Sequence, residues 1–166
     1  MVNFVKNVHQ ERDFERIKKF LVITSGQTAD VFKQRAVENL ILRIIKEKPY
    51  ILTMQDNRGL NLGMIAADYG LERVVVKCLD DETASLQVDN NGQTIGIHAA
   101  IAFLKKATIK AMRNRYAYWH LDNYGQRISN YAEKFMEVEE LRKVENKIKY
   151  ERALENMEKM RETKDL

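Results

Sequence analysis

The chain has 166 residues, of which 31% are charged and 45% hydrophobic, with a formal net charge of +4. This length suits one domain with a sizeable core, and the single proline and the lack of a Ser/Gly-rich tract argue against disorder or a two-domain split. The only cysteine, Cys78, excludes an intramolecular disulfide and a cysteine-based zinc site within one chain.

The N-terminal stretch lacks the basic, apolar and small-residue order of a secretory signal. No apolar run approaches the roughly 18 residues of a membrane span. We therefore expect a cytoplasmic protein without membrane contact, although a needle-type secretion signal into a host cell would leave no such pattern.

Two amphipathic helices are predicted before residue 56. The first covers 10–23, is followed by a break at 24–28, and carries the apolar residues Phe14, Ile17, Phe20 and Leu21. The second covers 31–46, ends before Pro49, and carries Val37, Leu40, Ile41, Ile44 and Ile45. Residues 1–55 are thus either N-terminal capping helices or a degenerate repeat.

Three DNxG tetrads follow at one fixed interval. They begin at Asp56, Asp89 and Asp122, which are 33 residues apart. Their glycines are expected to adopt positive φ in turns. This spacing predicts a repeat protein, with units at 56–88 and 89–121 and a third that begins at Asp122 and is clear over 122–137.

The positions after each tetrad also match at the same interval. A predicted first helix has matching apolar, glycine and alanine positions: Leu62 and Ile95, Gly63 and Gly96, Met64 and Ile97, and the pairs Ala66-Ala67 and Ala99-Ala100. Gly70 suits the end of this helix in the left-handed region, and a second apolar helix follows. One such unit has too little apolar surface to fold alone, so stacking must bury a continuous core.

The third unit keeps the register and then gives way to one long charged helix over 138–166. Glu-to-Lys and Glu-to-Arg pairs at helical spacing support this helix. Its apolar residues also suggest a homodimer through the C-terminal helix, although Glu151 and Glu155 interrupt the stripe: Leu141, Val144, Ile148, Leu154 and Met157.

The 33-residue period, with a turn and two short helices, resembles the ankyrin repeat family over at least residues 56–136. The family motif T-P-L-H-x-A falls on 61–66, 94–99 and 127–132, and the second of these reads TIGIHA. The family's proline is replaced by Leu62, Ile95 and Ile128, and His98 falls one place late. The resemblance implies an all-α, ankyrin-like solenoid of stacked helix-turn-helix repeats with capping helices.

In proteins of that family, partners dock on the turn tips and the inner face of the first helices. The resemblance places these positions by register at Asn57, Arg58, Leu60, Asp68, Tyr69, Asn90, Asn91, Gln93, Ile101, Ala102, Asn123, Tyr124, Gln126, Lys134 and Phe135. Tyr69, Ile101, Tyr124 and Phe135 would be the anchors. The leading hypothesis is a non-catalytic module that binds another protein on its concave face.

No catalytic or metal-binding constellation accompanies this frame. There is no phosphate loop, no G-x-S-x-G and no histidine pair at metal-ligand spacing. His98 is expected on a helix surface or in packing, and Cys78 in the core. We expect no enzymatic activity, no metal and no cofactor.

Two alternatives remain. Basic residues followed by Tyr116, Tyr118 and Trp119 could grip phosphates and stack bases, unless they face solvent while Tyr118 and Trp119 wedge between repeats: Lys105, Lys106, Lys110, Arg113 and Arg115. The acidic stretches 80–82 and 133–145 instead suggest an inhibitor or regulator that masks a nucleic-acid-binding enzyme. Nucleic-acid binding is the weaker hypothesis, and the partner's identity is not in the sequence.

Overall fold

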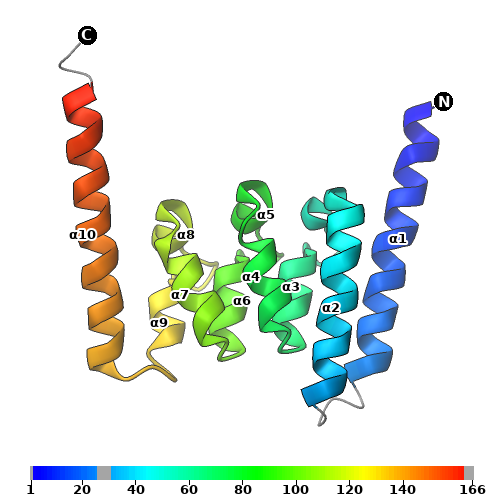
Figure 1. The fold of residues 1–166 in the computed structure, drawn as a ribbon, viewed down its shortest axis with the longest axis horizontal. Helices are drawn as coiled ribbons and strands as arrows, with labels where there is room; N and C mark the ends of the chain where they lie inside the picture. Colours follow the sequence, from blue (N-terminus) through cyan, green and yellow to red (C-terminus); the bar gives the residue numbers. More distant parts are fainter. Residues whose placement is uncertain (1, 26–30, 163–166) are drawn as a thin grey trace.

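The structure, a computed structural model, describes residues 2–25 and 31–162. Within these ranges the protein is all-helical and contains no β-strand. Figure 1 shows a row of short helices between two long ones, α1 (Val2–Ser25) and α10 (Val138–Glu162). The N-terminal end of α1 and the C-terminal end of α10 lie on the same side of this row. In the described part of the chain, no helix combines the length and apolarity needed to cross a bilayer.

The N-terminal end consists of α1, α2 (Val31–Glu47) and the 3-10 helix η1 (Pro49–Thr53). The apolar residues of α1 and α2 pack together, and most of them are buried: Phe14, Ile17, Leu21, Val37, Ile41 and Ile45. Leu40, which was predicted to share this stripe, is exposed. The break predicted at 24–28 starts too early, because α1 continues through Thr24 and Ser25; residues 26–28 lie outside the described residues.

Four short helices form the middle of the row: α3 (Leu62–Asp68), α4 (Glu72–Cys78), α6 (Ile95–Ile101) and α7 (Lys105–Arg113). α3 packs on α6, and α4 packs on α7. The paired alanines are buried, and Gly70 has a φ of 69° as predicted. A Cβ added at Gly96 would lie 2.6 Å from the Ala111 Cβ, so small residues allow the close helix approach that the sequence indicated.

Carboxylates also join the second helices to one another. Glu38 of α2 accepts a hydrogen bond from the backbone N–H of Arg73 (2.9 Å). Glu72 of α4 accepts one from the backbone N–H of Lys106 (2.7 Å). Each glutamate thus accepts a backbone N–H from the first turn of the following helix in this series, α4 for Glu38 and α7 for Glu72. Such first-turn N–H groups have no partner within their own helix.

Two further short helices, α5 (Glu82–Leu86) and α8 (Arg115–Trp119), were not predicted. Their caps stand 33 residues apart: Asp81 accepts from the N–H of Ala84, and Asn114 accepts from the N–H groups of Tyr116 and Ala117. We refer to η1, α5 and α8 as the finger helices; in Figure 1, α5 and α8 project toward the side on which the termini lie. In the acidic stretch 80–82, Asp80 thus lies in a turn, Asp81 caps α5 and Glu82 is its first residue.

The C-terminal end consists of α9 (Ile128–Ala132) and α10. α10 packs on α7, and it buries Leu141 and Ile148 against the stack. This corrects the surface expected for a homodimer, because these two residues lie in the protein's own core. Of the predicted apolar stripe, only Leu154 (38%) and Met157 (51%) are exposed.

Candidate functional site

The three DNxG turns share one geometry. The Oδ1 atom of each leading aspartate accepts two backbone N–H groups, from residues two and four positions later, at 2.8–2.9 Å. The glycines adopt φ values of 77°, 73° and 70°, which confirms the predicted positive φ. The aspartate fixes the turn, and the glycine supplies a conformation that other residues reach only at a cost.

Hydrogen bonds also link each turn tip to the next. The backbone N–H of Asn90 donates to the Arg58 carbonyl (3.0 Å), and that of Asn123 donates to the Asn91 carbonyl (2.9 Å). The side-chain amides of Asn90 and Asn123 add bonds to the carbonyls of Asn57 and Asn90 (3.3 and 3.1 Å). The tips thus form one continuous edge, which we call the tip ladder.

The second carboxylate oxygen of each turn aspartate has a different partner. Asp56 receives the ammonium of Lys18 from α1 (3.2 Å), and Asp122 receives the hydroxyl of Tyr131 (2.6 Å). Burial alone would raise the pKa of these two aspartates, but these bonds and the backbone N–H groups outweigh burial and lower it. Both turns therefore hold carboxylates in their charged form.

At the second turn this partner is His98, whose ring lies between two carboxylates. Its Nε2 is 3.3 Å from the Oδ2 of Asp89, and its Nδ1 is 3.0 Å from the Oδ1 of Asp68. The side chain is buried, as the packing alternative predicted, but the two carboxylates were missed. His98 thereby ties α6 to its own turn and to the end of α3.

Gln93, a predicted contact residue, also lies inside. Its amide donates toward the carboxylate of Asp122 and the hydroxyl of Tyr131 (both 3.3 Å), and the residue is only 8% exposed. Gln93 therefore holds two turns together, and its side chain is not available to a partner.

Leu60, a predicted contact residue that stands 33 positions before Gln93, is buried as well. Most of the other predicted contact residues fall into two separate groups. One lies on the turn tips and is exposed: Arg58, Asn90, Asn91, Tyr124 and Gln126. The other lies at the C-terminal ends of the first helices, where Tyr69 and Phe135 are half-buried and the others exposed: Asp68, Tyr69, Ile101, Lys134 and Phe135. Asp68 in the second group is engaged by His98.

An unpredicted residue, Phe103, completes the second group. It is exposed and has a φ of 59°, at the position where Gly70 has a φ of 69° in the preceding unit. Its ring meets Phe135 edge-on, with centroids 5.4 Å apart. We call Ile101, Phe103 and Phe135 the lower cluster.

Exposed apolar side chains also occur on the finger helices and the segments after them; of these, Leu86, Val88 and Leu121 were not predicted as contact residues. Leu86 and Trp119 stand 33 residues apart, as do Val88 and Leu121, and all four are exposed. Tyr116 of α8 and Tyr124 of the third tip are more exposed still, at 64% and 68%. We call these six residues the finger face. The available signal was the recurrence of apolar residues outside any helical stripe.

The predicted basic patch is divided by ion pairs. Lys105 pairs with Glu140. Lys110 pairs with Asp80 and donates to the carbonyl of Val76 (2.9 Å), and its bond lowers the pKa of Asp80.

Of the other three basic residues, Lys106 and Arg113 are exposed, and the side chain of Arg115 lies outside the described residues. This arrangement does not favour a continuous phosphate-binding surface. The ion pair with Lys110 also occupies Asp80, which is one of the acidic residues on which the inhibitor alternative depended.

Cys78 lies fully buried, and burial raises the pKa of its thiol to about 12. Such a thiol is a core residue without nucleophilic character. Across the described residues, no group of three or more His, Cys, Asp or Glu side chains is arranged to hold a metal ion.

No family model, curated protein or solved structure matches this chain.

Proposed function

We propose that the chain is an ankyrin-like solenoid that binds another protein through the finger face and has no catalytic role. The observation that carries this proposal is the recurrence of exposed apolar residues at one interval, Leu86 with Trp119 and Val88 with Leu121. Leu86 and Trp119 lie on α5 and α8, which contact each other, and exposed apolar and aromatic side chains on neighbouring elements are typical of protein-binding surfaces.

The rigidity of the turns supports the same function. Tyr124 extends from a turn whose backbone is fixed by Asp122 and by the tip ladder. Trp119 is held edge-on by Tyr118, with centroids 5.0 Å apart, and the guanidinium of Arg127 lies 4.7 Å from its ring centre. Side chains that are already ordered lose little conformational entropy when a partner binds.

The test compares two variants in partner capture from a lysate of the organism that carries the gene. Tyr116→Ser, Trp119→Ser and Tyr124→Ser together remove the aromatic residues of the finger face. Ile101→Ser and Phe103→Ser together alter the lower cluster and serve as the matched control. We expect the finger-face variant to lose a protein that both the wild type and the control retain.

Circular dichroism melting curves establish that both variants fold. Photo-crosslinking from position 124 should then label the captured protein, whereas crosslinking from Lys106, which is exposed on α7, should not. Capture that survives the finger-face variant but fails with the control would assign binding to the lower cluster and overturn the proposal.

A further inference from the structure

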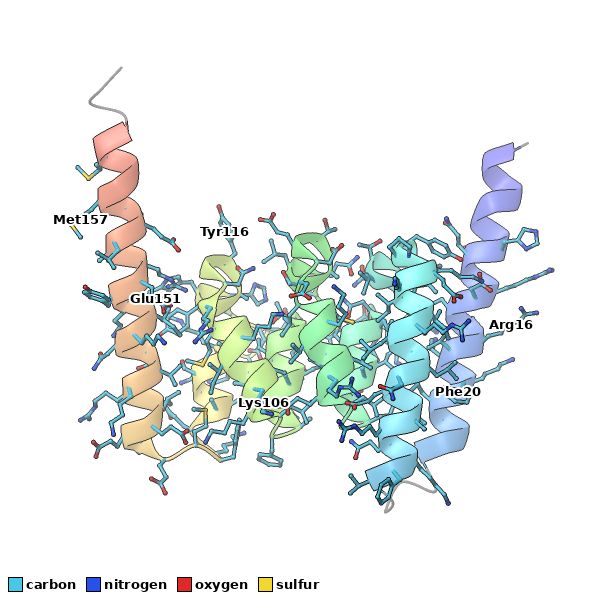
Figure 2. All side chains as sticks on the ribbon, viewed as in Figure 1. Arg16, Phe20, Lys106, Tyr116, Glu151 and Met157 are labelled. Carbon is cyan, nitrogen blue, oxygen red and sulfur yellow. The ribbon has the colours of Figure 1, made fainter. Side chains whose placement is uncertain are left out.

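A groove of about 560 Å³ lies between α8 and α10, beside the finger face. Its walls include Arg113, Tyr116 and Trp119 on one side and Lys149, Glu151 and Arg152 on the other. Figure 2 shows Tyr116 and Glu151 on these facing elements. The volume lies in the range of ligand-binding pockets, roughly 300–1,000 Å³.

The groove contains hydrogen-bond donors that lack acidic partners. Among the described residues, no carboxylate lies within ion-pair distance of Arg113, Lys149 or Arg152. Arg152 places its guanidinium 4.9 Å from the Tyr118 ring centre and donates from Nη2 to the Met112 carbonyl (3.3 Å). Its Nε is buried and has no acceptor within the described part of the chain.

Two carboxylates, Glu151 and Glu155, also line the groove. Glu151 lies 3.9 Å from the ammonium of Lys147, outside the groove lining. The three cations therefore outnumber the two acidic groups that line the groove, and a buried N–H without an acceptor is unfavourable. An incoming carboxylate would meet complementary charge here.

The aromatic side supplies an apolar contact next to these donors. Tyr116 and Trp119 are 64% and 51% exposed, so more than half of each side chain is free of internal packing. An aromatic or aliphatic side chain would cover them and remove apolar surface from water.

The length of the groove suits a peptide. Its lining on α10 extends from Ile148 to Asn156, which corresponds to about 12 Å at 1.5 Å per helical residue. About four residues of extended chain span that distance.

We propose that the groove binds a short acidic peptide segment of the partner. A carboxylate of the segment contacts Arg113, Lys149 or Arg152, and a neighbouring apolar side chain packs on Tyr116 and Trp119. This inference rests on the proposed function, since the segment belongs to the protein that docks on the finger face.

The experiment uses a phage-displayed library of random eight-residue peptides, selected on the full chain. Enriched peptides are expected to place Asp or Glu next to an aromatic or aliphatic residue. Trp119 is the only tryptophan, so its fluorescence reports directly on binding of the synthetic peptides. Affinity should fall with added salt, because exposed charge pairs are screened.

A pair of charge variants locates the contact. Arg113→Gln with Lys149→Gln removes two groove cations, both exposed, and is expected to weaken peptide affinity about tenfold. Lys106→Gln with Lys143→Gln removes the same charge from residues that neither line the groove nor pair with its carboxylates, and affinity should stay within about twofold because screening limits distant charges.

Peptides that lack acidic residues, equal affinities for the two variants, or no enrichment would each overturn the inference. A nucleoside monophosphate that changes Trp119 fluorescence when no peptide does would also overturn it, and would assign the groove to a nucleotide. The library contains no natural partner, so failure here combined with intact capture from lysate leaves the proposed function standing.

Discussion

Gly96 stands where α6 meets α7, and its missing side chain sets the distance between these helices. An added Cβ would lie 2.6 Å from the Ala111 Cβ and 2.9 Å from the Ile128 Cδ1. The Ala111 methyl is fixed to the backbone and cannot rotate away. We expect Gly96→Ala to lower the free energy of unfolding by about 1–3 kcal/mol, despite alanine's better helix propensity.

Urea denaturation measures this change. The control is Ser129→Ala, which alters the residue 33 positions later, where a Cβ is already present; it should change stability by less than about 0.5 kcal/mol. Equal stability of Gly96→Ala and wild type would show that the two helices can separate without cost.

Asp122 and Tyr131 make stability depend on pH. The pKa of Asp122 is lowered from its ordinary 3.8, because hydrogen bonds outweigh burial. Its stabilising contribution is therefore complete above that value and is lost as pH falls through the folded-state pKa. Burial and the bond to Asp122 raise the pKa of Tyr131 from 10.0 to about 12, so stability is also lost as pH rises between those values.

Tyr131→Phe should lower the urea midpoint at neutral pH and flatten both limbs of its pH profile, because the shared hydrogen bond is gone. Urea midpoints measured from about pH 2 to about pH 12 check this. An acid limb as steep as that of the wild type would assign the acid sensitivity to other aspartates, such as Asp56.

At the scale of elements, the start of α7 depends on a residue of α4. Leu104 provides no side-chain cap to α7, whereas Glu72 accepts from the N–H groups of Lys106 (2.7 Å) and Ala107 (3.4 Å). We expect Glu72→Ala to cost about 0.5–2 kcal/mol, like the loss of a helix cap. Amide hydrogen exchange at Lys106 and Ala107 should accelerate, and unchanged exchange there would contradict the cap.

The 33-residue spacing was enough to predict the turns, their positive φ angles, and the first and second helices of two units, α3 with α6 and α4 with α7. It did not reveal α5 and α8, because five residues contain too few positions for a helical period to stand out and, unlike α9, neither helix follows a DNxG tetrad. Only their caps, Asp81 and Asn114, carried a signal.

The candidate site was harder to predict, because its polar contacts join distant residues. His98 meets Asp68, 30 positions earlier. Gln93 reaches Asp122, 29 positions later. Carrying surface positions over by register therefore placed Gln93 outside, although the next turn buries it. Exposure at a stacked interface depends on both neighbours, and no single unit's sequence contains that information.

At the scale of the whole molecule, α10 closes one end of the stack. Ile148 is buried and Met157 is half-exposed on the same helix. Ile148→Ala is therefore expected to cost about 2–5 kcal/mol through lost packing and a cavity, whereas Met157→Ala should stay within about 0.5 kcal/mol. Urea unfolding of both variants checks this, and similar costs would mean that α10 is not seated as described.

The tip ladder and the two helical glycines have a consequence for the length of the protein. Asn123 bonds to Asn91 as Asn90 bonds to Arg58, and Ile128 fits over Gly96 as Ile95 fits over Gly63. A deletion that splices residue 88 to residue 122 would bring equivalent surfaces together, with α9 against α3. We expect this shortened chain to melt cooperatively at a lower temperature, because the same hydrogen bond and the same helix contact would form again at the splice; a chain without a cooperative transition would contradict this.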